Sequence, residues 1–319
     1  MSRARTADLS LSAATLAAVG AAGAFAYGAL VERNRYAVRR EVLPILPAGS
    51  RPLAVLHLSD IHMAPWQTDK QEWIRGLAGL EPDLIVNTGD NLGHVDAYDA
   101  VEYALEPFRD VPGVFVHGSN DYIAPKFKSP LTYFGGPSRA GAKPVALDNE
   151  RLTGFFESLG WLDLDNTARA LEVKGNRLEL FGVNDAHRDW DHLERIPGAL
   201  DDLRENVGWQ DEDGPAPFTI GLTHAPYQRV LNSFVTNGAE LIFAGHTHGG
   251  QVCVPGYGAL VTNCDIPRKQ VAGLSTWTHA FKTAQLEVSA GIGTSIYAPF
   301  RFACAPEAVL VTLTPPNMG

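Results

Sequence analysis

The chain has 319 residues, 45% of them hydrophobic, which is enough to bury one large core or two small ones. Its net charge of -10 argues against a nonspecific nucleic-acid binder, because such a protein presents a basic face to the phosphate backbone, and no nucleic-acid partner is expected. The three cysteines are too few to build a disulfide framework.

The first predicted element is an apolar, uncharged stretch at residues 9–31, long enough to cross a bilayer as a helix. Basic residues flank both of its ends, so the positive-inside rule gives no clear orientation. The apolar run continues past Ala26, which favours a single-pass anchor in the cell membrane over a secreted protein cleaved near Ala26. We therefore predict a membrane anchor and a basic linker at residues 1–47, and a globular domain at residues 48–319.

Five short apolar runs of that domain are typical of buried strands: 53–59, 83–89, 113–118, 218–223 and 239–245. In a sheet covered on both faces, the loops at the carboxyl ends of the strands meet at one edge, where ligands bind. We expect the loops to bring seven polar residues into one cleft: Asp60, His62, Asp90, Asn120, His224, His246 and His248. Two carboxylates, four imidazoles and an amide suit a pair of divalent metals, and such a pair drives phosphate-ester hydrolysis.

The segments that follow residue 122 are predicted to form a long loop, further helices and the strands of a second sheet. A long loop at 122–149 carries Lys126, Lys128 and Arg139, which could meet a charged substrate. After it come a helix and strand within 152–162, a hairpin about 174–176, and a helical stretch ending at 207. The apolar segments at 281–291 and 308–315 are expected to be strands of a second sheet. Arg301 is interpreted either as a phosphate ligand or as one half of a structural ion pair.

The polar motifs resemble, in type and order, those of the calcineurin-like metallophosphoesterases: Asp60-Ile61-His62, Gly89-Asp90, Gly118-Ser119-Asn120-Asp121, His224 and Gly245-His246-Thr247-His248. The piece GHTHGGQV at 245–252, with Pro255 soon after, looks like the branch of small, often membrane-associated bacterial phosphodiesterases. The resemblance extends from about residue 53 to the C-terminus. It implies an α/β fold, a four-layer α/β/β/α sandwich with two mixed sheets face to face, here preceded by the N-terminal transmembrane or signal helix.

The resemblance also implies a ligand scheme for two divalent metal ions, with manganese, iron or zinc as the metals that suit imidazole and carboxylate ligands. Asp60, His62 and His248 would hold the first ion, Asp90 would bridge both, and Asn120, His224 and His246 would complete the second. A metal-bound hydroxide would then attack the phosphorus of a phosphate ester.

One motif departs from the family pattern. The family reads Gly-Asn-His-Asp, with the His close to the leaving group, whereas this chain has Ser119 and Asn120 at the two central positions. Either Asn120 reaches the metal after a shift of one residue, or Ser119 is the ligand and Asn120 replaces the His. We favour Asn120, because an amide oxygen is the better neutral donor. His94 is the predicted substitute for the missing group, while His117 is predicted to be a packed histidine.

These residues lead to a functional prediction. The chain is expected to be a dinuclear metal-dependent phosphohydrolase whose catalysis depends on Asp90, Asn120, His224 and His94. A lost general acid costs ~10²–10⁴-fold, most of all for poor leaving groups, so a phosphodiester or pyrophosphate is the predicted substrate. A lipid-linked substrate is one option, because the anchor would hold the site near a bilayer. The alternative is a metal-binding but catalytically weak envelope sensor or scaffold.

Overall fold

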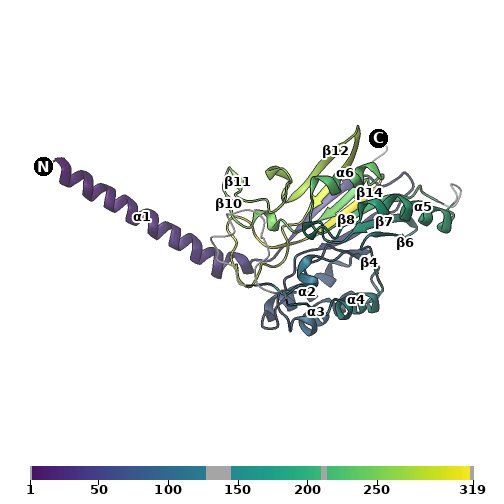
Figure 1. The fold of residues 1–319 in the computed structure, drawn as a ribbon, viewed down its shortest axis with the longest axis horizontal. Helices are drawn as coiled ribbons and strands as arrows, with labels where there is room; N and C mark the ends of the chain where they lie inside the picture. The colour runs from purple at the N-terminus through teal and green to yellow at the C-terminus, as the bar shows by residue number, and fades with distance from the viewer. Residues whose placement is uncertain (1, 127–144, 210–213, 317–319) are drawn as a thin grey trace.

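Two six-stranded β-sheets form the centre of the protein, for which a computed structural model describes residues 2–126, 145–209 and 214–316 (Figure 1). The first sheet has the order β1 (Ala37–Pro44), β14 (Glu307–Thr314), β2 (Leu53–Leu58), β3 (Leu84–Asn87), β4 (Gly113–Phe115) and β5 (Trp161–Asp163). The second has the order β12 (Gly273–His279), β13 (Lys282–Val288), β9 (Leu241–Ala244), β8 (Phe218–Thr223), β7 (Asn176–Val183) and β6 (Thr167–Val173). Each sheet contains parallel and antiparallel pairs, which confirms the prediction of two mixed sheets.

Helices cover the outer face of each sheet. In Figure 1, α2 (Thr68–Gly76), α3 (Tyr98–Leu105) and α4 (Asn149–Ser158) lie below the strands. These three helices pack with the first sheet, while α5 (Ile196–Val207) and α6 (Gln228–Thr236) pack with the second. A short two-stranded sheet, β10 (Cys253–Val254) and β11 (Gly258–Ala259), lies outside the main layers. The layers therefore run helix, sheet, sheet, helix.

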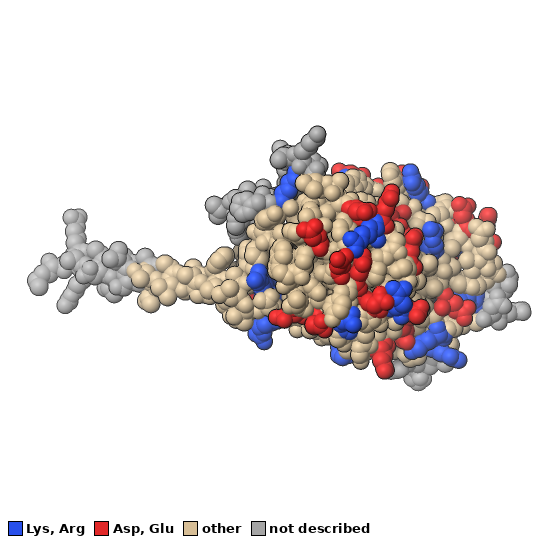
Figure 2. Space-filling view, turned by 90° about the horizontal axis from the view of Figure 1, so that it is seen from below, with Lys and Arg blue, Asp and Glu red and all other residues tan. Residues whose placement is uncertain are grey.

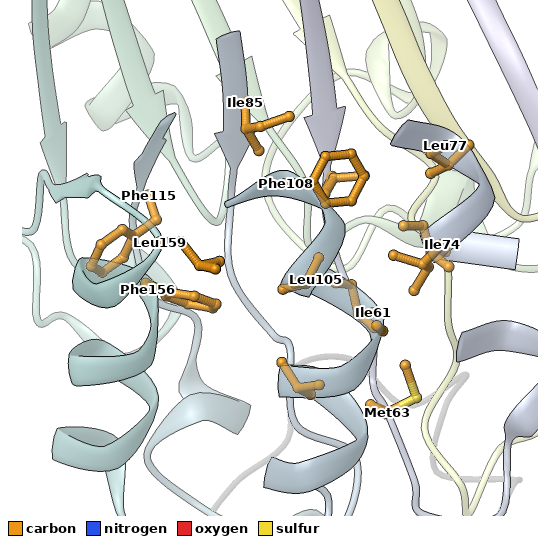
Figure 3. Packing of buried hydrophobic residues seen from close by; sticks show 14 of the residues in the cluster. Ile61, Met63, Ile74, Leu77, Ile85, Leu105, Phe108, Phe115, Phe156 and Leu159 are labelled. Carbon is orange, nitrogen blue, oxygen red and sulfur yellow. The ribbon is translucent and has the colours of Figure 1, made fainter. Parts of the chain in front are cut away.

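Three clusters of buried apolar side chains hold these layers together. The central one joins the facing sides of the two sheets, for example Val55 and Val86 of the first with Leu180 and Phe243 of the second. Figure 3 shows an outer cluster, in which α2–α4 and their loops pack against the first sheet. Full burial of one such side chain stabilises the fold by about 1.5–3 kcal/mol. The five apolar runs predicted from the sequence are strands β2, β3, β4, β8 and β9, and their apolar side chains belong to these clusters.

The order of strands confirms some predictions and corrects one. The hairpin about 174–176 joins β6 to β7, and the helix and strand predicted at 152–162 are α4 and β5. Strand β13 belongs to the second sheet, as expected. Strand β14 does not: it lies in the first sheet between β1 and β2, so its assignment to the second sheet was wrong. Its apolar pattern shows that both faces are buried but not which neighbours bury them.

Strand β1 lies within the segment that we assigned to the anchor and linker. It pairs in parallel with β14 along its whole length, Ala37 opposite Glu307 through Pro44 opposite Thr314. Arg39 of β1 donates hydrogen bonds to Glu287 at 2.5 Å and to Glu307 at 3.0 Å, which ties the strand to β13 and β14. The basic stretch at 32–40 is therefore partly a strand of the first sheet.

The N-terminal helix α1 (Ser2–Leu30) extends away from the two sheets (Figure 1). At its foot, the ring of Phe25 packs against Phe300, and Arg33 donates a hydrogen bond to the carbonyl of Pro299. Among the described residues, no helix combines the length and the apolar character that crossing a bilayer requires. Of the cationic residues predicted in the 122–149 loop, Lys128 and Arg139 lie outside the described residues.

Candidate active site

The predicted metal ligands meet where the loops leave β2, β3, β8 and β9. Two groups of these ligands place potential metal-binding atoms within 4.8 Å of one another: Asp60, His62 and His248 in one, and Asp60, Asp90 and His224 in the other. All of these side chains are buried or nearly so. The loops thus bring together five of the seven predicted ligands in two overlapping groups.

Asp90 lies between the two halves of this cluster. Its Oδ2 is 3.6 Å from Nε2 of His62 and 3.5 Å from Nε2 of His224. On the first side, Nε2 of His248 lies 3.3 Å from Nε2 of His62 and 3.5 Å from Oδ1 of Asp60. One carboxylate therefore faces imidazoles of both halves, which is the position a bridging ligand requires.

His246 and Asn120 complete the second half. Nδ1 of His246 lies 3.1 Å from Nε2 of His224. The Asn120 side-chain amide donates to Oδ2 of Asp90 at 2.6 Å, and its backbone N–H donates to Oδ1 at 2.8 Å. Ser119 instead directs its backbone N–H to Asp185 at 3.0 Å. All seven predicted ligands are thus in one cluster, and Asn120 rather than Ser119 contacts the central carboxylate.

Hydrogen bonds at the back of two histidines orient their rings. Nδ1 of His224 lies 2.7 Å from the carbonyl of Thr88, so this nitrogen donates and leaves Nε2 to face Asp90. In His246 the roles are reversed: Nε2 lies 3.2 Å from the carbonyl of Asn263, and Nδ1 faces the cluster. Such outer bonds fix the tautomer of a metal-binding imidazole. The ring nitrogens that face the cluster are the ones able to bind a metal.

Burial and charge set the protonation of the cluster. Burial lowers the pKa of His62, and it lowers the pKa of His246 and His248 well below the usual value, so these three rings are neutral near pH 7. For His224 burial acts in the same direction, but the charge of Asp90 outweighs it and raises the pKa well above its ordinary value. Burial acts to raise the pKa of Asp90, yet His224 holds it well below the usual range. The metal-free site therefore contains an imidazolium–carboxylate pair.

The backbone is strained at the site. Five of the clustered residues have positive φ angles: Asp60 (49°), His62 (41°), Asp90 (56°), His246 (66°) and His248 (49°). This left-handed conformation is rare for residues with a side chain and costs about 1–3 kcal/mol each. It persists where surrounding contacts fix it, and it concentrates at functional sites. The loops are thus held in a conformation that aims these side chains inward.

Two glycines make room for the carboxylates. A Cβ at Gly118 would come far inside van der Waals contact of Oδ1 of Asp90, and one at Gly245 would do the same to Oγ of Ser59 and Oδ2 of Asp60. Because Asp60 Oδ2 also accepts a hydrogen bond from the Ser59 hydroxyl at 2.6 Å, this pair cannot move aside freely. The glycines of these motifs are required by the close approach of the chain to the ligands.

The buried carboxylate of Asp121 fixes the loops after β3 and β4 relative to each other. Its carboxylate accepts hydrogen bonds from the backbone N–H groups of Asp90 at 2.9 Å, Asn91 at 2.7 Å and Gly118 at 3.1 Å. The loops after β3 and β4 are therefore joined through one buried carboxylate. Its partners are these backbone groups and the side-chain amide of Asn91 at 3.3 Å, so the last Asp of the motif positions the ligand loops and does not face the cluster itself.

Other predicted residues lie elsewhere. His94 packs edge-on against Trp66 and accepts a hydrogen bond from the Asp96 backbone, so the structure does not bring it into the ligand cluster. His117 is buried and pairs with Asp165 at 2.9 Å, in keeping with a packed histidine.

Arg301 matches neither of its two interpretations. It is fully buried, and Nη2 donates to the carbonyls of Ala290 at 2.7 Å, Gly291 at 2.9 Å and Gly293 at 2.7 Å. The same Nη2 lies 3.5 Å from Nδ1 of His248. The guanidinium is thus occupied by backbone oxygens behind a predicted ligand, and it supports the loop.

One residue of the site was not predicted. The ring of His187 lies 4.6 Å from that of His246, and its Nδ1 lies 2.9 Å from the hydroxyl of Tyr227. His187 follows β7 by four residues, after the buried Asp185, so the rule that polar residues after a strand line the cleft would have found it. No neighbouring motif accompanies it, so the motif pattern alone does not single it out.

The donor set fits a pair of divalent ions. Oδ1 of Asp60 is buried and has no hydrogen-bond partner, although two imidazole nitrogens lie within 3.9 Å of it. A buried carboxylate oxygen without a partner is costly, and a cation between it and the two nitrogens would satisfy all three atoms. Carboxylate, imidazole and amide ligands are those of manganese, iron and zinc sites.

Comparison with known proteins agrees with this geometry. The sequence profile of the calcineurin-like phosphoesterases matches residues 53–250, well over half of the chain. The chain belongs to the calcineurin-like phosphoesterase family. It is therefore a metal-dependent phosphoesterase, and the two ligand groups described above correspond to a divalent metal pair.

Matches to individual proteins cover most of this chain. The uncharacterized protein YpbG of Bacillus subtilis is 26% identical over 272 residues, which cover 84% of each chain. The phosphodiesterase YaeI of Escherichia coli is 25% identical over 309 residues, covering 94% of this chain and 96% of YaeI. Among solved structures, the 5'-nucleotidase precursor of Thermus thermophilus matches with a TM-score of 0.45 at 13% identity, covering 82% of this chain and 55% of that one.

Proposed function

We propose that this phosphoesterase hydrolyses phosphodiesters or pyrophosphates in preference to monoesters with poor leaving groups. The observation that carries the proposal is the position of Asn120, whose amide contacts Asp90 where the family pattern has an Asn followed by a His. An amide has no acidic proton to give to a departing alkoxide. A substrate whose leaving group departs without protonation loses least from this substitution.

In this proposal, each half of the cluster holds one ion: Asp60, His62 and His248 in the first, Asn120, His224 and His246 in the second, with Asp90 shared. When bound, two divalent ions would supply an activated water and offset the negative charge of the phosphoryl oxygens. A half-turn of the Asn120 amide would direct its oxygen, instead of its nitrogen, into the cluster. His224 would lose its proton in the metal-loaded site, because an imidazolium cannot be a ligand.

Several residues of the chain keep this arrangement fixed. Asp121 holds the loops that carry Asp90 and Asn120, and Asp185 receives the backbone N–H of Ser119. Burial raises the pKa of Asp185 to about 6. His187 packs against His246 and is itself bound by Tyr227. These contacts orient the ligands before any substrate arrives, which is the usual source of precision in such sites.

A lipid-linked substrate and a membrane location are the further parts of the proposal. Apolar side chains of α1 are exposed, among them Leu16 (74%), Phe25 (64%) and Leu30 (70%). Residues 15–30 include no charged side chain, and Figure 2 shows this segment without the red and blue groups that are interspersed on the body. Such a surface is stabilised by contact with lipid. A membrane-held site would meet substrates whose tails lie in the same bilayer.

The substrate preference is tested with the full-length chain in detergent, loaded with manganese. Two p-nitrophenyl esters, one diester and one monoester, share a leaving group that departs without protonation. The leaving group of ethyl phosphate must be protonated by a general acid. We expect turnover of both p-nitrophenyl esters and a far lower rate on ethyl phosphate. An Asp90→Ala variant measures the background. Equal or faster hydrolysis of ethyl phosphate would overturn the preference for diesters and pyrophosphates.

The membrane location is tested separately. Carbonate-washed membranes from cells that express the full chain should retain the protein, with the N-terminal peptide upstream of Ala26 still present by mass spectrometry. A protein that begins after Ala26 in the culture medium would support cleavage of a signal instead. Recovery of the intact chain in the soluble fraction would contradict both.

A further inference from the structure

Two of the three cysteine thiols meet beneath the loop that carries His248. Sγ of Cys253 lies 3.2 Å from the carbonyl oxygen of Gly249, and Sγ of Cys304 lies 3.6 Å from the same oxygen and 3.2 Å from that of His248. The backbone N–H of Cys253 also donates to the carbonyl of Phe302 at 2.8 Å, which fixes the two segments side by side. Both thiols therefore contact the same peptide carbonyl.

The surroundings of these thiols favour reaction. Both cysteines are free and only partly buried. Nη1 of Arg301 lies 3.9 Å from Sγ of Cys304. The guanidinium thus lies beside the sulfur that would react first with a small-molecule disulfide. Cys264, the third cysteine, packs with Cys253 against the apolar cluster of the second sheet, but the thiols that contact the carbonyls of His248 and Gly249 are those of Cys253 and Cys304.

The loop above the thiols is under backbone strain. Four consecutive residues have positive φ angles: His248 (49°), Gly249 (60°), Gly250 (80°) and Gln251 (55°). Glycine adopts this conformation readily, so the strain lies at His248 and Gln251. Such a conformation persists only while surrounding contacts fix it. The hydrogen bonds from the two thiols to the carbonyls of His248 and Gly249 are among those contacts. A change at the sulfurs would therefore act directly on the position of His248.

We propose that Cys253 and Cys304 form a reversible disulfide that displaces His248 and thereby lowers the activity of the metal site. Disulfide sulfurs carry no hydrogen, so both thiol hydrogen bonds to the loop carbonyls are lost on oxidation. The bond also draws the two sulfurs to about 2 Å from each other, which pulls the chain segments on which they lie. Loss of contacts that orient a metal ligand typically costs 10–100-fold in metal affinity or activity.

The oxidant is a low-molecular-weight disulfide such as oxidised glutathione. The thiolate of Cys304 attacks one of its sulfurs, forming a mixed disulfide and releasing one glutathione thiolate. The thiolate of Cys253 then attacks the Cys304 sulfur and releases the second. The two cysteines lose two electrons and two protons, and the oxidant becomes two glutathione thiols.

Formation of the disulfide does not depend on the proposed function. The predicted effect of the disulfide on turnover rests on the proposed function. The full-length protein is treated with oxidised glutathione, dialysed, and divided into portions with and without dithiothreitol. Thiols counted after denaturation should fall from the three of the sequence to one, and a Cys253–Cys304 cross-linked peptide should be found by mass spectrometry. Turnover of the p-nitrophenyl diester should fall roughly tenfold or more and return with dithiothreitol.

Two serine variants complete the test. The double variant Cys253→Ser with Cys304→Ser keeps hydroxyl donors at both positions. Its turnover should be the same before and after treatment with oxidised glutathione. Cys264→Ser should respond as the wild type does. Three remaining thiols, or a cross-link through Cys264, would overturn the disulfide, and a Cys253–Cys304 link with unchanged turnover would overturn the switch. If the reduced protein has no turnover, the proposed function fails while the thiol count still decides the disulfide.

Discussion

The side-chain amide of Asn120 donates a hydrogen bond of 2.6 Å to Oδ2 of Asp90, the carboxylate oxygen that also faces His62 and His224. The residue that follows Ser119 therefore reaches the centre of the cluster, while Ser119 is turned towards Asp185. This arrangement favours a shift of one residue relative to the family pattern over a serine ligand. It leaves the position beside the leaving group without an imidazole from this loop.

Restoring the family order should restore the missing chemistry. In the double variant Ser119→Asn with Asn120→His, the loop reads Gly-Asn-His-Asp, with an amide for the metal and an imidazole for the leaving group. We expect turnover of ethyl phosphate to rise roughly 10²-fold, the low end of what a general acid contributes, with little change for p-nitrophenyl phosphate. Steady-state rates on both monoesters measure the difference.

The single variant Asn120→His provides the control for that experiment. If Asn120 is the ligand, this change removes its amide oxygen. Because an imidazole can itself bind a metal, Asn120→Ala is measured beside it, and there bound manganese measured after dialysis should fall. A single variant that keeps its metal and gains activity on ethyl phosphate would show that Ser119 is the ligand. The metal content thus shows whether Asn120 or Ser119 is the metal ligand, independently of any rate.

The sequence predicted the cluster because the ligands share one simple relation to the fold. Asp60, Asp90 and His224 each directly follow a continuous apolar run, and such runs are the central parallel strands whose ends meet. His187 obeys the same rule after β7 but carries no motif. Its role depends on packing against His246, a contact between distant segments that spacing along the chain does not encode.

The strands at the edge of the first sheet were harder to predict for a different reason. In β1 the charged residues Arg39, Arg40 and Glu41 interrupt any apolar alternation, and the strand is specified by pairing with β14 and by the bonds of Arg39 to Glu287 and Glu307. These partners lie about 250 residues away along the chain. Sequence patterns report burial, whereas the choice of neighbouring strand depends on the tertiary fold.

Replacing Gly118 should disable the site without unfolding the protein. In Gly118→Ala the new Cβ displaces Oδ1 of Asp90, and a shift of about 1 Å at a catalytic group costs roughly 10²-fold in rate. We expect that loss in diester turnover. The matched control is Gly154→Ala in α4, where a Cβ meets nothing within 4 Å and should stabilise the fold by about 0.5–1 kcal/mol. Full activity in Gly118→Ala would show that Asp90 can move without consequence.

Binding of metal should release a proton from His224. The charge of Asp90 raises the pKa of this imidazole well above its usual value, so it is protonated in the metal-free site at pH 7. A ligand must be neutral, and about one proton should therefore be released per site filled by the second ion. Calorimetric titration with manganese in buffers of different ionisation enthalpy measures the number. A binding enthalpy that is the same in all buffers would contradict the imidazolium–carboxylate pair. As a control, the variant His192→Gln, at a partly exposed position outside the cluster, should behave as the wild type.

The buried pair of His117 and Asp165 should make stability depend on pH in a defined window. Burial acts to lower the pKa of His117, but Asp165 at 2.9 Å outweighs it and raises the pKa from 6.5 to about 9. The folded state therefore binds more protons than the unfolded state between these values. The stabilisation is fully present below pH 6.5 and is lost as pH rises through 9, to a total of roughly 3 kcal/mol.

Urea denaturation of the metal-free protein with EDTA, at pH 6 and pH 9.5, measures this effect. His117→Gln should be less stable than the wild type at pH 6, because Asp165 loses its cationic partner, and the two proteins should converge as the pH approaches 9.5. His192→Gln, at a partly exposed position where the ring pairs with the exposed Glu194, should follow the wild-type curve throughout. If the wild type and His117→Gln differ by the same free energy at both pH values, His117 does not carry a proton in the folded protein, and its bond to Asp165 is a neutral one.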